Sequence, residues 1–232
     1  MNMIKYIDSN VFNANADAIV NTVNCVGFMG KGLAFEFSLR YPKLLEQYVE
    51  KCEKKEIKVG EIFYYQDSDK LIINFPTKND YKFPSKLSWI ESGLKNLVDT
   101  YKYYNIKVLA MPPLGCGYGG LNRKDVFELI EKYLGNLDIE VLVCLDKINP
   151  EGKEYEMITN FKNISIDKLS NYIKLNNKQK NNLKITQKTI KRFYDISNTE
   201  GIGLTTYKSI HEYFYKKQGI DTIDYSSQLT LF

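Results

Sequence analysis

Histidine is nearly absent from this sequence, which contains only His211. A single imidazole largely excludes catalytic triads that use histidine and metal sites held by several histidines. Any chemistry is therefore expected from carboxylate, lysine, cysteine or asparagine side chains, or from backbone groups.

Closely spaced cysteines and long apolar runs are also missing. The four cysteines, at positions 25, 52, 116 and 144, form no C-x-x-C pair and no zinc-knuckle spacing. The first residues contain no apolar stretch typical of a signal peptide, and no apolar run approaches the roughly 20 residues that cross a bilayer. We expect a cytoplasmic protein with reduced thiols.

Charge of either sign is in little excess. The 32 basic and 28 acidic side chains give a net charge of +4, which permits contact with nucleic acid without arguing for it. A hydrophobic content of 44% is enough for a packed core.

Short apolar runs alternate with helix-length amphipathic segments up to about residue 148, which predicts an α/β domain with a mixed sheet between helices. Pro42 suits the first turn of a helix, and Ser85 and Asn122 suit helix caps. The expected strands are residues 18–20, 61–65, 71–75, 108–111 and 141–145.

Composition changes after residues 149–152, and the remainder is rich in Lys, Asn, Tyr and Ile. We predict a small α-helical module over residues 155–232. Its expected helices lie near residues 166–175, 186–197 and 206–217, and residues 176–182 (NNKQKNN) are expected to form a solvated loop.

Two glycine-rich segments each follow a predicted strand and precede a predicted helix. They are NTVNCVGFMGKGLA (residues 21–34) and PLGCGYGGL (residues 113–121). Glycines let a backbone approach an anion, and free N–H groups at a helix start attract it. Two such loops at the carboxyl ends of strands predict a cleft for a diphosphate; one glycine cluster alone would indicate only a tight turn.

A third segment, NFPTK (residues 74–78), ends at Lys78. A lysine after a strand is normally a solvated charge. If this strand ends at the same sheet edge as both glycine loops, the amine faces the bound sugar and is a candidate nucleophile toward an anomeric carbon.

In this order and spacing, NTVNCVGFMGKGLA, INFPTK and PPLGCGYGG resemble macrodomains of the DarG type over roughly residues 1–148. These are the antitoxin halves of DarT–DarG systems and are related to the human terminal ADP-ribose glycohydrolase. The resemblance implies a macrodomain that binds ADP-ribose and removes it from DNA bases, with no metal or cofactor.

The resemblance also implies a set of binding residues. Asn10 and Val11 match the segment near the adenine. Many macrodomains have an aspartate there that receives the adenine amino group, and the amide oxygen of Asn10 is expected to accept it instead. Asn24 is the candidate to hydrogen-bond the distal ribose. The two loops and the residue before the lysine supply the remaining expected contacts: Gly30, Lys31, Gly32, Leu33, Thr77, Pro113, Leu114, Gly115, Cys116, Gly117, Tyr118, Gly119, Gly120 and Leu121.

Lys78 matches the catalytic lysine of this group, acting at C1″ of the distal ribose either as a nucleophile or through its charge. The human relative also uses an acidic residue in the second loop, where this chain has residues 117–120 (GYGG). The sequence therefore lacks an obvious acid for the second step. Cys25 and Cys116 lie in the loops without a histidine partner, which favours a packing role.

Three alternatives stay open at the level of sequence: a reader that binds ADP-ribose without hydrolysis, a hydrolase of ADP-ribosylated protein side chains or of a free metabolite, and a chain that acts mainly as a protein inhibitor. The expected partners are ADP-ribosylated DNA and a DarT-type toxin, which the C-terminal module would bind.

Two further features of the C-terminal part suggest other partners. It carries a basic, tyrosine-rich face that would instead contact DNA phosphates. This face consists of Lys191, Arg192, Tyr194, Tyr207, Lys208, Tyr213, Tyr215, Lys216 and Lys217. Its last residues, QLTLF (228–232), resemble the short peptide with which bacterial proteins bind the replication sliding clamp.

Overall fold

The computed structural model describes residues 3–68, 70–146 and 149–216. The chain divides into two compact units, Met1–Ile148 and Asn149–Phe232, each described here by itself. The first helix of the second unit begins at Gly152, so this unit starts before the expected residue 155. Within the described residues, no helix combines the length and apolar character that crossing a bilayer requires.

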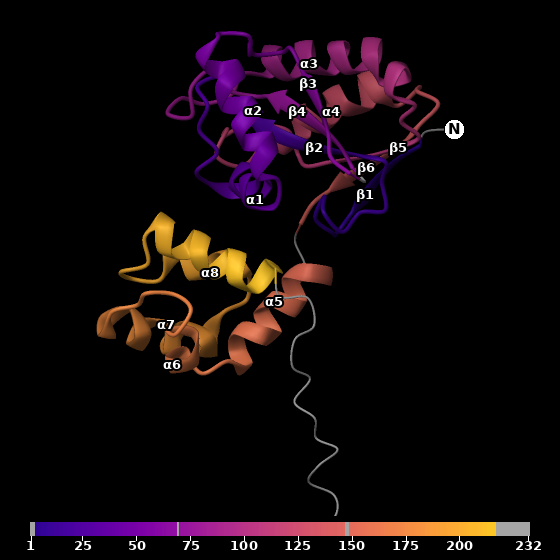
Figure 1. Cartoon of the computed structure of the whole chain (residues 1–232). Coiled ribbons are helices and arrows are strands. Elements are labelled where there is room, and N and C mark those ends of the chain that lie inside the picture. The colour runs from indigo at the N-terminus through magenta and orange to yellow at the C-terminus, as the bar shows by residue number, and fades with distance from the viewer. Residues whose placement is uncertain (1–2, 69, 147–148, 217–232) are drawn as a thin grey trace, which may run out of the picture. The chain divides into compact units, whose positions relative to one another are not determined.

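A six-stranded sheet forms the centre of the first unit (Figure 1). Its strands are β1 (Ile4–Ile7), β2 (Ala18–Val23), β3 (Phe63–Gln66), β4 (Leu71–Pro76), β5 (Val108–Met111) and β6 (Glu140–Cys144). The strand order is β1-β6-β5-β2-β4-β3, and all neighbours are parallel except β3, which runs antiparallel to β4. The mixed sheet expected from the sequence is confirmed.

Two helices cover each face of this sheet. On one face lie α1 (Gly32–Arg40) and α2 (Pro42–Glu53), and on the other lie α3 (Leu87–Thr100), extended by η1 (Tyr101–Tyr104), and α4 (Arg123–Leu134). Figure 1 shows the two pairs on opposite sides of the strands.

Strand side chains alternate between these two layers, as the pleat of a strand requires. Ala18 and Val20 of β2 pack with α3 and α4, whereas Ile19 between them packs with α1 and α2. Because both faces are covered, β2 and β4 are buried almost throughout.

The strand register brings the three sequence motifs to one edge of the sheet. Val23 at the end of β2 pairs with Pro76 at the end of β4, and the Thr77 N–H donates to the Val23 carbonyl over 2.9 Å. On the other side of β2, Met111 at the end of β5 pairs with Val143 near the end of β6. The loops that follow β2, β4 and β5 therefore begin side by side.

The second unit is helical, with α5 (Gly152–Asn163), α6 (Ile166–Leu169), α7 (Asn177–Thr189), η2 (Phe193–Asn198) and α8 (Leu204–Lys216). Three buried rings meet at its centre: Phe193 and Phe214 each pack edge-on or tilted against Phe161 at centroid distances of 6.4 and 5.8 Å. The Glu154 carboxylate accepts two hydrogen bonds from the Arg192 guanidinium, over 2.9 and 2.8 Å, and one from the Phe193 N–H.

Several expectations for this unit were wrong. The segment NNKQKNN is not a loop, because Asn176 and Gln179 form a capping box that starts α7. The helix expected near 166–175 ends at Leu169, and the one near 186–197 is the end of α7 followed by the separate η2. The helix α5 was missed.

Two residues of the predicted basic, tyrosine-rich face are used inside the unit, whereas Lys191, Lys208 and Lys216 are exposed as expected. Tyr207 is buried in the core, and the Arg192 guanidinium is paired with Glu154. The clamp-like peptide, residues 228–232, lies outside the described residues.

Candidate functional site

A cavity of about 800 Å³ opens at the edge where the parallel strands end. Most of the residues expected to bind ligand line it: Asn10, Val11, Asn24, Gly30, Lys31, Gly32, Leu33, Thr77, Lys78, Pro113, Gly115, Cys116, Gly117, Tyr118, Gly119 and Gly120. The structure therefore brings the three motifs together around one space.

Leu114 and Leu121 are the exceptions. The Leu114 side chain is fully buried in the core beneath the second loop, and Leu121 packs against the same core. Their apolar side chains anchor the loop at the two points where it leaves and rejoins the packed layer.

The first glycine loop is braced from within by Asn24. Its Oδ1 accepts hydrogen bonds from the Val26 and Phe28 N–H groups and from the Tyr48 hydroxyl, and its Nδ2 donates to the Phe28 carbonyl over 2.6 Å. The acceptor that was expected to hold the distal ribose is thus used by the loop. Asn24 lines the cavity but acts first as the brace that sets the shape of the loop.

The helix after this loop begins in the wall of the cavity, which Gly32 and Leu33 line. Lys31 precedes α1 in an extended conformation and makes no side-chain cap hydrogen bond, and Gly32 at the helix start has φ +57°. Free N–H groups at a helix start, with the positive end of its dipole, favour an anion such as a phosphate.

The second glycine loop is a tight, self-bonded turn. Gly115 has φ +68°, and the Leu121 N–H donates back to the Gly115 carbonyl over 3.1 Å. A Cβ on Gly119 would lie 2.2 Å from the Gly115 carbonyl oxygen, so only glycine fits there. The Ser85 N–H donates to the Gly119 carbonyl over 2.9 Å. Ser85 is therefore a brace of this loop, and the residue preceding α3 is Lys86.

The two loops meet across the cavity. The Tyr118 ring lies 3.2–3.3 Å from where a Gly32 Cβ would be. At the start of α4, Asn122 accepts a hydrogen bond from the Lys124 N–H, as expected for a cap, and the next residue, Arg123, lines the cavity. Arg123 adds a cation to a site that already offers Lys31, which suits a diphosphate.

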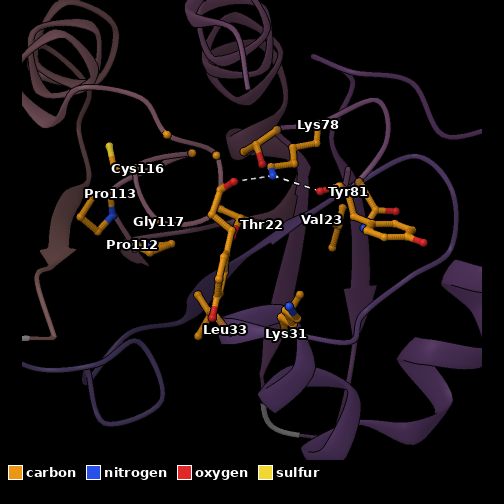
Figure 2. Close-up of a pocket in the computed structure, with 18 of the residues that line it drawn as sticks. Thr22, Val23, Lys31, Leu33, Lys78, Tyr81, Pro112, Pro113, Cys116 and Gly117 are labelled. Atoms are coloured by element: carbon orange, nitrogen blue, oxygen red, sulfur yellow. Dashed lines mark hydrogen bonds between the residues drawn. The ribbon is translucent and has the colours of Figure 1, made fainter. Parts of the chain in front are cut away.

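Lys78 lies at the junction of all three motifs. Its Nζ donates to the Tyr118 carbonyl over 2.5 Å and to the Tyr81 carbonyl over 3.3 Å, and Figure 2 shows the amine held between the two oxygens. Burial lowers the pKa of this amine below its ordinary value of 10.5. Both hydrogen bonds can be made by a neutral amine, which then keeps one lone pair for attack.

The far end of the cavity is lined by Asn10, Val11 and Asp146. The Asn10 Oδ1 accepts from the Phe12 and Asn13 N–H groups over 2.9 and 3.1 Å. This side-chain oxygen, expected to receive the adenine amino group, is instead used by its own turn, as short polar side chains often are.

Neither loop cysteine has the environment of a thiolate nucleophile. Burial raises the pKa of both the Cys25 and the Cys116 thiols to about 11, so at neutral pH each is a thiol rather than a thiolate. The packing role expected for them fits these values.

Sequence reasoning missed several lining residues, among them Arg123, Asp146, Phe28, Tyr81 and Phe83. The segment from Tyr81 to Pro84 begins three residues after Lys78, and this closeness in sequence was an available signal. Only the folded loop shows that the segment reaches the cavity.

Comparison with known proteins places this site in a family. The model of the Macro domain family matches residues 20–130. The DNA ADP-ribosyl glycohydrolase of Mycobacterium tuberculosis is 40% identical over 146 residues, which cover 61% of this chain and 42% of that protein. The chain thus spans less than half the length of the curated relatives it matches.

Two solved structures agree with this. The macrodomain of Thermus aquaticus DarG has a TM-score of 0.59 at 38% identity, and the match covers 62% of this chain and 98% of that one. The Thermosipho africanus DarTG in complex with ADP-ribose has a TM-score of 0.60 at 33% identity, and the match covers 65% of this chain and 44% of that one. The chain therefore belongs to the macrodomain family, and its first unit is of the DarG type.

Proposed function

We propose that the chain is a DNA ADP-ribosyl glycohydrolase, and that it acts as the antitoxin of a DarT-type toxin. The observation that carries the proposal is the Lys78 amine, held by two carbonyls where both glycine loops and the end of β4 meet. The names of the relatives, a DNA ADP-ribosyl glycohydrolase and a DarTG bound to ADP-ribose, support the same reaction.

In this proposal the diphosphate lies against the glycine loops, with the N–H groups of α1 and the cations of Lys31 and Arg123 as partners. The adenine end lies toward Asn10 and Val11, and the distal ribose toward Lys78. This direction is the one that the resemblance to DarG-type macrodomains implies.

The reaction at Lys78 breaks the bond between C1″ and the DNA base. The Nζ lone pair forms a bond to C1″, and the electron pair of the broken bond leaves with the base, which takes up the proton that Nζ loses. Water then adds to C1″, one of its protons passes to Nζ, and the lysine leaves as a neutral amine, so free ADP-ribose is the product. In a second form of the mechanism, the ammonium supports the departing charge and water attacks directly.

The first test compares the wild type with Lys78→Ala on an oligonucleotide that carries one ADP-ribosylated base. Wild type should release free ADP-ribose, whereas the variant should bind the substrate and release at least about 100-fold less. Lys58→Ala, at an exposed lysine outside the cavity, is the matched control and should keep full activity.

If the wild type binds ADP-ribose but releases none from DNA, the chain is a reader or acts on another linkage. An ADP-ribosylated protein tested in parallel separates these two alternatives, because release from protein alone would identify a protein hydrolase.

The toxin as a partner is part of the same proposal. The Thermosipho africanus match is a DarTG protein, and a curated relative is a fusion of a DNA ADP-ribosyl transferase with the glycohydrolase. A toxin that modifies DNA acts inside the cell, so the proposal implies a cytoplasmic protein.

We also keep sliding-clamp binding as a proposal, which rests on the QLTLF sequence alone. A labelled peptide of the last ten residues titrated with the clamp should bind, and exchange of its leucines and phenylalanine for alanine should abolish binding. A flat titration would end this proposal.

A further inference from the structure

One peptide group of the second glycine loop turns its oxygen toward the Lys78 amine. Residues 117–120 form a turn, closed by a hydrogen bond of 3.0 Å from the N–H of its last residue to the carbonyl of its first. The central peptide group of this turn joins Tyr118 to Gly119, and its carbonyl accepts the 2.5 Å hydrogen bond from the Lys78 Nζ. The loop that is expected to hold a diphosphate thus presents an oxygen at this point, where a phosphate needs a donor.

Hydrogen bonds hold the loop on both sides of this central peptide. The Ser85 N–H donates to the Gly119 carbonyl over 2.9 Å, and the Leu121 N–H donates to the Gly115 carbonyl over 3.1 Å. A Cβ added at Gly120 would meet no atom within 4 Å, so there is open space beside the turn. The central peptide can therefore rotate while the rest of the loop keeps its course.

The turn has the residue type that both orientations of its central peptide need. Rotation of this peptide converts a type I turn into a type II turn, in which the third residue has a positive φ and is usually glycine. The third residue here is Gly119, and its φ lies outside the left-handed region in this structure. The structure therefore shows the first orientation, and the sequence permits the second.

A buried hydroxyl lies on the side to which the carbonyl would turn. In a type II turn, the central carbonyl lies on the same side as a Cβ of the third residue, which is why glycine is preferred there. A Cβ on Gly119 would lie 2.4 Å from the Ser85 Oγ. This hydroxyl belongs to a side chain that is 6% exposed, and it makes no hydrogen bond within the part of the chain that the structure describes. Because buried hydroxyls nearly always have a partner, it is suited to donate to the rotated Tyr118 carbonyl.

A second group on that side explains why the first orientation is the resting one. The Gly115 carbonyl oxygen lies 2.2 Å from the same Cβ position on Gly119. It would repel the rotated Tyr118 carbonyl, and the hydrogen bond from Lys78 would be lost. Rotation therefore needs a ligand that interacts more favourably with the second orientation.

We propose that the Tyr118–Gly119 peptide is a switch that couples the binding of a diphosphate to the release of the Lys78 amine. After rotation the Gly119 N–H takes the place of the oxygen and donates to a phosphate, and the Ser85 hydroxyl donates to the Tyr118 carbonyl. The amine then loses this partner and approaches C1″. The inference rests on the proposed function and adds a condition to it: Lys78 is held back until the loop contains a diphosphate.

The first test uses ADP, which has the diphosphate but lacks the distal ribose that would cover Lys78. Acetic anhydride acetylates accessible amines, and peptide mass spectrometry measures the rate at each lysine. With saturating ADP, acetylation at Lys78 should become about 3- to 10-fold faster, because the amine no longer donates to the Tyr118 carbonyl. Adenosine, which has no phosphate, should leave the rate unchanged. Lys58, an exposed lysine outside the cavity, is the internal control.

The second test is Ser85→Ala, which removes the hydroxyl and keeps the backbone N–H that braces the loop. The variant should be at least as stable as wild type, because the hydroxyl has no partner in the resting form. Its affinity for ADP, measured by calorimetry, should nevertheless fall about 3- to 10-fold, and ADP should speed acetylation at Lys78 less than in wild type. Ser88→Ala, at an exposed serine of α3, is the matched control and should equal wild type in all three measurements.

Three results would overturn the inference. They are an unchanged or slower acetylation at Lys78 with ADP, an ADP affinity of Ser85→Ala equal to that of wild type, and a crystal structure with ADP in which the Tyr118 carbonyl still accepts from Lys78. None of these measurements depends on hydrolysis. A chain that shows the ADP effect but releases no ADP-ribose from DNA keeps the switch and loses the proposed function. A chain that releases ADP-ribose without the ADP effect keeps the function and loses the switch.

Discussion

At the scale of single residues, the Lys78 amine decides between the two forms of the mechanism. Burial lowers its pKa, and two carbonyls occupy two of its N–H groups. We expect the neutral amine to attack, so kcat should rise with pH as the amine loses its proton and then level off. The pKa of this rise should lie below 10.5. A pH profile of single-turnover rates between about pH 6 and pH 10 measures this.

The opposite slope would show that Lys78 acts through its charge, because raising the pH removes the ammonium. Lys78→Arg separates the two forms again, since a guanidinium keeps its charge and does not act as a nucleophile. Retained activity in that variant would contradict the covalent form.

A pair of glycines in the second loop gives another test at this scale. Gly119→Ala would place a Cβ against the Gly115 carbonyl, whereas a Cβ on Gly117 meets nothing within 4 Å. We expect Gly119→Ala to cost about 1–3 kcal/mol and lower the Tm of the first unit by about 3–10 °C. Gly117→Ala is the matched control, and its Tm should equal that of wild type.

ADP-ribose titrations of the same variants locate the ligand. Weaker binding by Gly117→Ala at an unchanged Tm would show that the ligand approaches this backbone closely. If Gly119→Ala were as stable as wild type, the close contact with Gly115 would not constrain the loop.

At the scale of elements, the sequence predicted the site better than the helical unit. The apolar runs Ala18–Val20 and Val108–Met111 lie in strands whose two faces are both covered, so their pattern is strong. The strand β1 was missed because it lies at the sheet edge, where its residues are partly exposed. The start of α7 was taken for a loop because its polarity outweighed the capping signal of Asn176.

Within the site, the sequence predicted which segments meet but not how each side chain is used. Both Asn10 and Asn24 were expected to bind ligand through their amide oxygens, yet these oxygens accept backbone N–H groups of their own loops. A motif identifies the residue type, and an asparagine suits both ligand binding and bracing of its own loop. Only the folded loop shows which of these two roles the side chain has.

The contact between α5 and η2 provides a prediction at this scale. Glu154 is almost fully buried and holds the Arg192 guanidinium and the Phe193 N–H. Arg192→Ala would leave its carboxylate without that cation, at a cost of about 2–3 kcal/mol. Amides of α5 and η2 should then exchange hydrogen about 30- to 150-fold faster.

Lys178→Ala is the matched control, because the Lys178–Glu200 pair is exposed on both sides and such pairs contribute little. Exchange in this variant should match the wild type. Equal exchange in Arg192→Ala as well would show that the buried pair does not stabilise the unit.

At the scale of the whole molecule, the two units are expected to carry different functions. The expected cavity residues all lie within residues 1–148, and both core layers of the sheet lie there too. Residues 149–232 have a separate aromatic core. We therefore assign the proposed hydrolysis to the first unit and the proposed binding of the toxin to the second.

Deletion of residues 149–232 tests this assignment. We expect the truncated chain to keep ADP-ribose binding, measured by calorimetry, and to lose co-purification with a tagged DarT-type toxin from the same genome. Full-length Lys78→Ala is the matched control: it should lose hydrolysis and keep the toxin, because the two functions use different units. Toxin retained by the truncated chain would assign binding to the macrodomain, and neutralisation would then depend on one unit for both tasks.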